Sequence, residues 1–301
     1  MTQDRALLAA TPGSGMHAGT NRSGGGSQAS PPLFPTVPAE AVVAAYAKAP
    51  GNEFSSGKIA SPESSAALVA NAFGFFLLRP ADLPKLPSIP AEVEWPPTRI
   101  GLEKCVRFPW RGGLHPWLDA LVDTPSHIVG VESKRYEPFR PRKPPVFSDA
   151  YWGDVWGGAM APFLAMRDRL RDVPSAYLHL DAAQLVKHAL GLRTMAKGSG
   201  KRPFLLYLHA EPLAWPNGTP VPPDRIRRHA EEAASFAEAV RGAEVEFATA
   251  TYAELLAAMR GSGVPEVRRH AEDLTGLLAV SPGRSGGVAL EVGGQGGPSH
   301  P

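Results

Sequence analysis

Two short apolar runs joined by a turn constrain this chain more than any other feature of its sequence. Residues 117–123 (WLDALVD) and 127–134 (HIVGVESK) each alternate in the manner of a β-strand. Between them stands Thr124-Pro125-Ser126-His127, a four-residue loop with proline at the second position, as in a type I turn. These segments predict a tight antiparallel hairpin in the middle of the chain.

The register of this hairpin brings acidic side chains together. It pairs residue 121 with 130 and therefore Asp119 with Glu132, whose Cβ atoms would lie about 4.5–5.5 Å apart. Because side chains alternate along a strand, Lys134 shares a face with Glu132. Two carboxylates at this separation repel each other, and a divalent cation relieves that repulsion. The alternative is that both acids face solvent, with Lys134 as their salt-bridge partner.

The segments around the hairpin predict a mixed sheet flanked by helices, in the order α-β-β-β-α-α-β-α-β-α. The expected helices and strands, besides the hairpin, are a helix over 61–77, a strand ending at Phe108, helices over 157–172 and 175–192, a strand over 203–211, a helix over 224–241, a strand over 243–250 and two short helices to about Val280. The helix over 175–192 would end at Gly191 or in the basic loop that follows.

Composition bounds the domain and its surroundings. Residues 1–38 and 281–301 are rich in Gly, Ser and Pro, which predicts disordered tails around one domain of residues 39–280. The formal net charge is only +2, so a polyanion would have to be bound by local basic patches or by metal. The single cysteine, Cys105, excludes an intramolecular disulfide, and neither a secretory signal nor a membrane-spanning run is evident. We expect a cytoplasmic protein with no membrane partner.

The expected helix over 175–192 carries a narrow polar stripe opposite its apolar face. The stripe consists of Tyr177, Asp181, Gln184 and His188. A polar stripe usually faces water, but this one is poor in Lys and Glu, and its Gln and His suit the orientation of a water or a phosphodiester. The tryptophans, Trp117 among them, are interpreted as core or interface residues.

With these residues in place, the chain resembles the PD-(D/E)xK, or restriction-endonuclease-like, phosphodiesterase superfamily. The motif would be Pro116-Trp117-Leu118-Asp119, then Glu132-Ser133-Lys134, with Gln184 on a helix after it. The α-β-β-β-α-β order expected over about 61–250 matches that superfamily's core. The blocks LDALVDTPSHIVGVESKRYEPF and YLHLDAAQLVKHALGL look like an uncharacterised bacterial group within it. One departure is that the family's Pro normally abuts the Asp, whereas Pro116 stands three residues before Asp119.

The resemblance implies a Mg²⁺-dependent endonuclease that hydrolyses the phosphodiester bonds of DNA, with Mn²⁺ as an alternative ion. Asp119 and Glu132 would ligate the metal, Lys134 would assist the attacking water, and Gln184 would support the site. Because restriction-type cleavage of both strands often uses a dimer, a homodimer is compatible with it. The alternative function is a non-catalytic nucleic-acid-binding or interaction protein that kept the fold, against which the intact Asp, Glu and Lys argue. A third possibility is a nuclease that acts on RNA or on nucleic-acid ends.

Further residues are candidates for the same site. The superfamily often adds an acidic residue from its first helix, for which Glu63 is the nearest candidate, and Glu103 on the strand before the hairpin competes with it. The stretch SKRYEPFRPRK interleaves basic and aromatic side chains, which suits contact with phosphates and bases, although a solvated Pro-rich loop would look the same. The candidate nucleic-acid contacts are Arg107, His115, Arg135, Arg140 and His188.

Two other chemistries are excluded by spacing. No two histidines flank a glutamate in the i, i+4 pattern of zinc enzymes, and one cysteine cannot build a thiolate cluster. The Gly-x-Ser-x-Gly elbow of serine hydrolases is also missing from the sequence.

Overall fold

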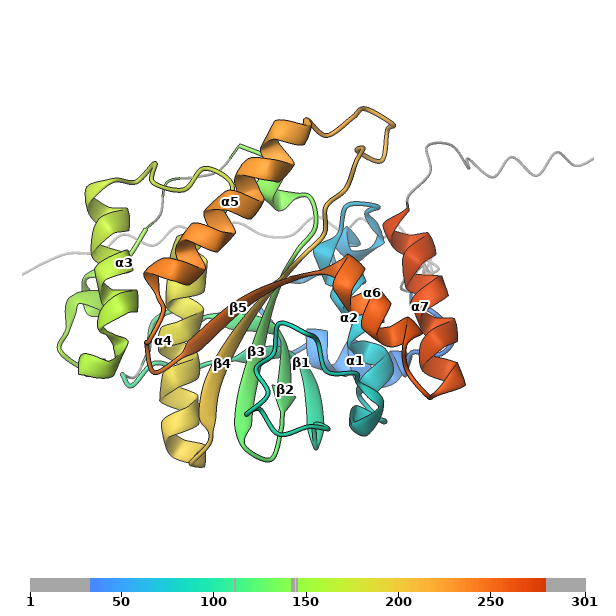
Figure 1. Ribbon diagram of the computed structural model, residues 1–301, viewed down its shortest axis with the longest axis horizontal. Coiled ribbons are helices and arrows are strands. Elements are labelled where there is room, and N and C mark those ends of the chain that lie inside the picture. The colour runs from blue at the N-terminus through green and yellow to red at the C-terminus, as the bar shows by residue number, and fades with distance from the viewer. Residues whose placement is uncertain (1–32, 111, 142–143, 145, 280–301) are drawn as a thin grey trace, which may run out of the picture. The chain divides into compact units, whose positions relative to one another are not determined.

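A computed structural model describes residues 33–110, 112–141, 144 and 146–279 (Figure 1). Residues 1–32 of the first expected tail, the whole second tail (281–301) and residue 280 lie outside the described residues. Residues 33–38, which the sequence assigns to the first tail, belong to the domain: Val37 is buried, and the Phe34 amide donates to Asn71 Oδ1 over 2.8 Å. In the part of the chain that the structure describes, no helix is both long and apolar enough to cross a membrane.

Five strands form one mixed sheet in the order β1-β2-β3-β4-β5, with β1, β2 and β3 antiparallel and β3, β4 and β5 parallel. The predicted hairpin is confirmed at the bounds that the sequence gives, with residue 121 paired to 130. The strands are β1 (Arg99–Cys105), β2 (Trp117–Asp123), β3 (His127–Lys134), β4 (Arg202–His209) and β5 (Glu246–Thr251).

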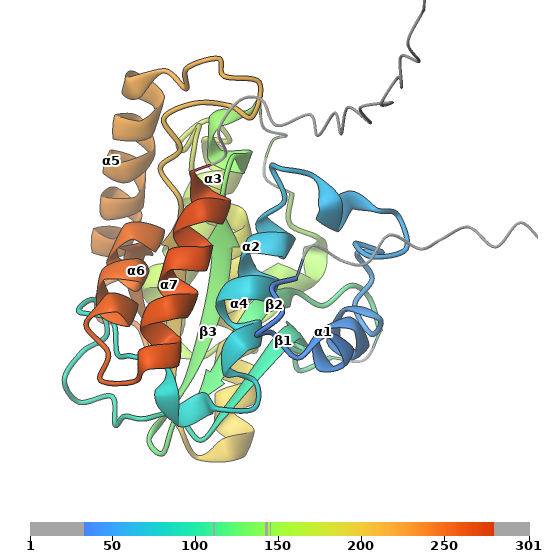
Figure 2. The same cartoon turned by 90° about the vertical axis from the view of Figure 1, so that its right-hand side faces the viewer.

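Helices cover both faces of the sheet (Figures 1 and 2). One face, the α2 face, packs against α1 (Ala39–Tyr46), α2 (Ser65–Ala72), α6 (Tyr252–Arg260) and α7 (Pro265–Leu278). The other, the α4 face, packs against α3 (Ala161–Asp172), α4 (Ala182–Ser199) and α5 (Pro223–Ala239). Val129 and Val131 point to the α2 face and Ile128 to the α4 face, as the alternation of β3 predicts.

Short 3₁₀ helices connect several of these elements within the described residues. They are Lys58–Ala60, Gly74–Phe76, Pro80–Asp82, Glu137–Phe139, Asp149–Trp152 and Gly158–Met160. The helix α1 and the first of these turns were not anticipated from the sequence. The mixed α/β architecture with flanking helices was predicted from the sequence.

Two helices begin later than the sequence predicts, because side-chain caps set their first turns. The Ser64 hydroxyl accepts the amide of Ala67 over 3.0 Å, so α2 starts at Ser65 and not at Ser61. The Asp181 carboxylate accepts the amide of Gln184 over 2.9 Å, so α4 starts at Ala182 and not at 175. Tyr177 therefore lies before the helix and does not extend the stripe of Gln184.

Glycines let α4 pack closely against the sheet and against the residue that follows β1. The helix runs past Gly191 to Ser199, and a Cβ added at Gly191 would lie 2.7 Å from Val106 Cγ2 and 2.9 Å from the Val106 carbonyl oxygen. A Cβ added at Gly130 on β3 would lie 2.8 Å from Leu118 Cδ1. Gly191 is therefore a site of close packing and not the end of the helix. This approach brings the first turns of α4 over the end of β3.

Candidate functional site

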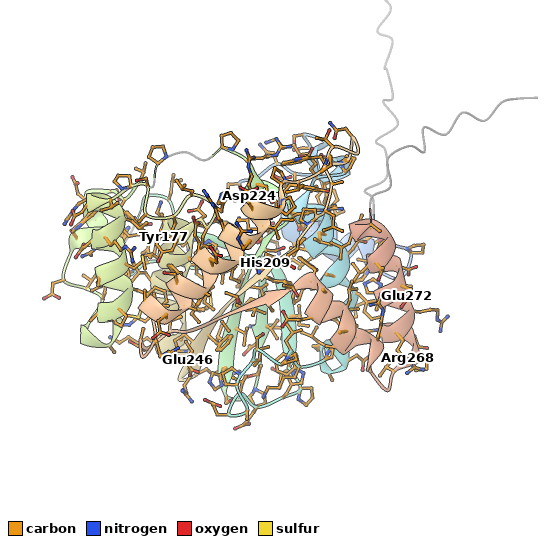
Figure 3. The ribbon with its side chains drawn as sticks, turned by 45° about the horizontal axis from the view of Figure 1, so that its top comes forward. Tyr177, His209, Asp224, Glu246, Arg268 and Glu272 are labelled. Carbon is orange, nitrogen blue, oxygen red and sulfur yellow. The ribbon has the colours of Figure 1, made fainter. Side chains whose placement is uncertain are left out.

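The candidate residues gather at the carboxyl ends of β3 and β4, where open α/β sheets usually bind ligands. Lys134 ends β3 and lies opposite His209, which ends β4. Figure 3 shows His209 at this end of the sheet and Glu246, the first residue of β5, at the other.

The expected direct pairing of Asp119 with Glu132 is wrong in its detail. The ladder between β2 and β3 ends at Ala120 and Val131, one residue before it. The Asp119 side chain turns to the β3 backbone instead, where Oδ2 accepts the amide of Ser133 over 2.6 Å. Asp119 and Glu132 thus lie just past the point where the two strands separate.

The reason for this departure lies in β1. Glu103 falls opposite Asp119 in the register of β1 and β2, and its φ of 47° is left-handed, which is uncommon for a non-glycine residue. On either side of Asp119 the alternation breaks, since Leu118 packs on the α4 face and Ala120 on the α2 face. Asp119 is therefore released from the regular alternation on which the predicted pairing rested.

Glu132 is held in a buried network of charges. Its side chain is 1% exposed, Lys134 Nζ donates to Oε1, and His188 Nδ1 lies 3.1 Å from Oε2. Burial alone would raise the pKa of Glu132, but Lys134 and His188 outweigh it and lower the pKa to about 2. Burial would likewise lower the pKa of Lys134, but Glu132 and Asp119 raise it above its usual range. Both groups of the ion pair are charged at neutral pH.

The carboxylates beside this network are less well compensated. Burial, and then the charge of Glu132, raise the pKa of Asp119 well above its usual range, although Lys134 and the Ser133 amide oppose the shift. Burial raises the pKa of Glu103 to about 7, with further contributions from Glu53 and Glu132. Both carboxyl groups are therefore shifted towards their protonated, neutral form.

Two cavities open at this end of the sheet. One, of about 830 Å³, is called here the lysine cavity and is lined by Trp117, Lys134, Arg140, Gln184, Lys187 and His188 among others. The other, of about 470 Å³, is called the acidic cavity; its charged lining residues are Glu53, Glu63, Glu103, Asp119 and Glu137 with the cations Lys58 and Arg140. Glu137 and Arg140 line both. Lys134 and Asp119 thus face adjoining spaces, and Glu132 is buried beside Lys134 without lining either cavity.

The acidic cavity fits a hard divalent cation. Within the described ranges, no three His, Cys, Asp or Glu residues are assembled closely enough to hold a metal. Mg²⁺ does not need three, because it commonly uses one or two carboxylates and keeps several waters. Five acidic side chains and two cations line this cavity, and burial together with neighbouring carboxylates raises the pKa values of Asp119 and Glu103, which a bound cation would lower. Glu63 lines the same cavity but forms an ion pair with Arg140.

Some of the other expected site residues line the lysine cavity and some do not. Gln184 and Arg140 line the lysine cavity, as a substrate-contacting role requires. His188 also lines it, but is only 2% exposed and is held against Glu132. Its place therefore suits positioning of Glu132 better than contact with a nucleic acid.

The remaining basic candidates lie elsewhere. Arg135 is buried on the α2 face, where it donates to the Leu277 carbonyl oxygen over 2.6 Å. His115 accepts the amide of Phe108 over 3.1 Å and thereby holds the loop before β2. Arg107 is exposed beyond β1 and lines neither cavity. The structure thus brings none of these three to the lysine cavity.

Sequence reasoning missed three residues of the site. Lys187 lies about one helical turn after Gln184 on α4 and lines the lysine cavity. Its i+3 spacing from Gln184 would have indicated that the two side chains are neighbours. Trp117, which the sequence predicts to be a core or an interface residue, belongs to neither sheet-face core and lines the same cavity. Tyr252, whose hydroxyl lies 2.7 Å from Ser133 Oγ, supports the motif from α6, and no local pattern marks it.

Comparison with protein-family models, curated proteins and solved structures found no match for this chain. The functional interpretation therefore depends on the site itself. Its chemical features are a buried, charged carboxylate and ammonium, a second carboxylate in an excess of negative charge, and adjoining cavities that open at the ends of parallel strands. Such a site can bind a divalent cation and a polyanion side by side.

Proposed function

We propose that this chain is a Mg²⁺-dependent endonuclease that hydrolyses phosphodiester bonds of DNA. The observation that carries the proposal is the convergence of Asp119 with the buried Glu132–Lys134 pair where β2 and β3 separate, between two cavities. The proposal includes a restriction-endonuclease-like core. It is supported by the order α2-β1-β2-β3-α4-β4, interrupted only by α3 and 3₁₀ turns within the described residues.

In this proposal the two carboxylates hold the metal. Bound Mg²⁺ would lower the pKa of a water and neutralise charge that builds on the phosphate. Asp119 offers the carboxylate oxygen that does not accept from Ser133. Glu132 accepts from Lys134 through Oε1, and its Oε2 lies 3.1 Å from His188 Nδ1. Mn²⁺, which also accepts oxygen ligands, would serve as an alternative ion.

Lys134 acts as a donor and not as a base. Because neighbouring carboxylates raise its pKa, the ammonium stays protonated at neutral pH. It lines the lysine cavity with a side chain that is 16% exposed, so it can reach a phosphate oxygen or orient the attacking water. Gln184, which lines the same cavity from α4, would orient the phosphodiester.

A non-catalytic nucleic-acid-binding protein is the second candidate. The observation that favours it is that both oxygens of Glu132 already face Lys134 and His188, as in a purely structural ion network. Calorimetric titration with Mg²⁺ or Mn²⁺ separates the two. The nuclease binds one of these ions and loses that affinity in Asp119→Asn, whereas a structural network gives no metal-binding heat that depends on Asp119.

Cleavage of supercoiled plasmid tests the proposal itself. Purified protein with Mg²⁺ is expected to nick or linearise the plasmid, and EDTA to stop it. Asp119→Asn should abolish cleavage, whereas Asp123→Asn should not, because Asp123 lies at the far end of β2 and pairs with Lys201 over 2.5 Å. Equal cleavage by the two variants would remove Asp119 from the mechanism. The oligomeric state of the same preparation tests whether the active species is a homodimer, as proposed. A DNA substrate is compatible with the expected cytoplasmic location.

A further inference from the structure

Trp117 presents an unoccupied ring to the lysine cavity. In the described part of the chain, its ring contacts no other aromatic ring and its indole nitrogen makes no hydrogen bond, and its side chain is half-buried. Trp156 differs in every respect: it is 1% exposed, contacts the rings of Phe108 and Tyr151, and donates to a carbonyl oxygen. Trp117 is therefore not packed into an aromatic cluster of the described residues, and its exposed part lines the lysine cavity, where a ligand can contact it.

Lys187 supplies a cation to the same cavity. Among the described residues, no carboxylate lies within salt-bridge distance of it; burial lowers the pKa of Lys187, and the charge of Asp181 opposes that shift. Its ammonium instead lies 5.2 Å from the ring centroid of Phe147 and 5.8 Å from that of Tyr151. These rings hold the side chain in place without neutralising its charge, so Lys187 can contact an anion.

The size of the lysine cavity limits what can enter it. Its volume of about 830 Å³ lies within the roughly 300–1,000 Å³ of small-ligand sites. Treated as a cube, it measures roughly 9 Å across, less than the ~12 Å width of the major groove alone in duplex DNA. A whole duplex therefore cannot enter this cavity, whereas one or two nucleotides can.

Resting on the proposed function, we infer that the lysine cavity takes an unpaired nucleotide, so that the enzyme acts on DNA where it is single-stranded, including the transiently unpaired regions of a supercoiled plasmid. The base stacks on Trp117, and the phosphate beside it contacts Lys187. Stacking on a side chain requires a base whose face is not already covered, which holds in a single strand and not within a duplex. Lys134, which lines the same cavity, then lies beside the strand that is cleaved.

Fluorescence anisotropy in EDTA tests the inference without cleavage. A labelled single-stranded 12-mer should bind about tenfold more tightly than a blunt duplex of the same sequence. Trp117→Leu should weaken single-strand binding about tenfold, and Trp117→Phe should retain most of it because stacking is kept. Lys187→Met should lower the slope of log affinity against log salt by about 0.7. Lys197→Met, an exposed position on the same helix, is the matched control and should change neither quantity.

Cleavage of the same two substrates with Mg²⁺ separates the inference from the function. Cleavage of strand and duplex at equal rates, with Trp117→Leu unaffected, would overturn the single-strand assignment and leave the nuclease standing. Selective binding of the strand without cleavage of either substrate would overturn the nuclease. Tighter binding of an RNA strand than of the DNA strand would overturn DNA as the ligand. Thermal unfolding of each variant shows that it is folded.

Discussion

Two glutamates at the same end of the sheet are held in opposite ways. Glu132 is fully buried beside Lys134 and His188, and its pKa is lowered to about 2. Glu103 lies among other carboxylates, and burial raises its pKa to about 7. The first group is stabilised as a charge, and the second would be stabilised by a proton or a cation.

Because Glu132 is buried and charged, the stability of the fold depends on its ion pair with Lys134. Removing one partner of a buried ion pair typically costs about 3–5 kcal/mol, so we expect that loss of unfolding free energy for Lys134→Met at pH 7. The folded pKa of Glu132, about 2, lies below the ordinary value of about 4.3. The stabilisation of the fold by ionised Glu132 is therefore fully present above about pH 4.3 and is lost as the pH falls towards 2.

The difference in unfolding free energy between wild type and Lys134→Met should therefore become smaller as the pH falls from about 4.3 to about 2. Urea unfolding at a series of pH values measures it. Lys201→Met, which removes the partly exposed pair with Asp123, is the control and should cost about 1 kcal/mol or less. A Lys134→Met variant as stable as Lys201→Met at pH 7 would show that Glu132 is not held as a charge.

Glu103 gives the opposite pH dependence. Because its folded pKa is raised, its favourable contribution is present below about pH 4.3 and is lost as the pH rises through 7. Glu103→Gln should therefore stabilise the protein at pH 8, by about 1–2 kcal/mol once solvent screening is allowed for, and change little at pH 4. Thermal unfolding in EDTA measures this, with the exposed Glu92→Gln as control. A Glu103→Gln variant less stable than wild type at pH 8 would contradict it.

At the scale of single residues, the sequence predicted the positions of some side chains and not of others. Period-two alternation placed Glu132 and Lys134 correctly, because β3 is regular throughout. It failed for Asp119, because the left-handed backbone of Glu103 on the neighbouring strand is not visible in local sequence. It also gave no indication that Arg135 would be buried, since a basic residue after a strand is usually exposed.

At the scale of elements, α4 determines how the site is assembled. Its first turns carry Gln184, Lys187 and His188 to the end of β3, and its middle packs closely against the residue that follows β1. The sequence predicted a polar stripe on a helix but placed the helix seven residues too early. Capping by Asp181 and the close approach at Gly191 depend on tertiary neighbours, which periodicity does not show.

Two glycines on α4 test this packing. An added Cβ at Gly191 would meet the backbone oxygen of Val106, which cannot move cheaply, whereas at Gly198 it would meet nothing within 4 Å. We expect Gly191→Ala to destabilise the protein by about 1–3 kcal/mol through overpacking. Gly198→Ala should instead stabilise it, by up to about 1 kcal/mol, through helix propensity. Denaturant unfolding compares them, and a stabilising Gly191→Ala would contradict the close contact.

At the scale of the whole molecule, a mixed sheet holds the site between two layers of helices. The sequence predicted this architecture because long amphipathic helices alternate with short apolar strands, and these are its most regular features. The bounds of the strands in the hairpin were also predicted, since the turn at Pro125 fixes them. The two cavities were not, because their walls come from segments distant in sequence, such as the loop before α2 and the start of α4.

Single-turnover cleavage of labelled DNA over a series of Mg²⁺ concentrations tests the central claim most directly. Wild type should cleave with a rate that saturates in Mg²⁺. Asp119→Asn should lose that Mg²⁺ dependence, and Lys134→Arg, which keeps the charge beside Glu132, should be about 10²-fold slower at saturating Mg²⁺. Wild-type rates in both folded variants would show that this end of the sheet is not a phosphodiesterase site.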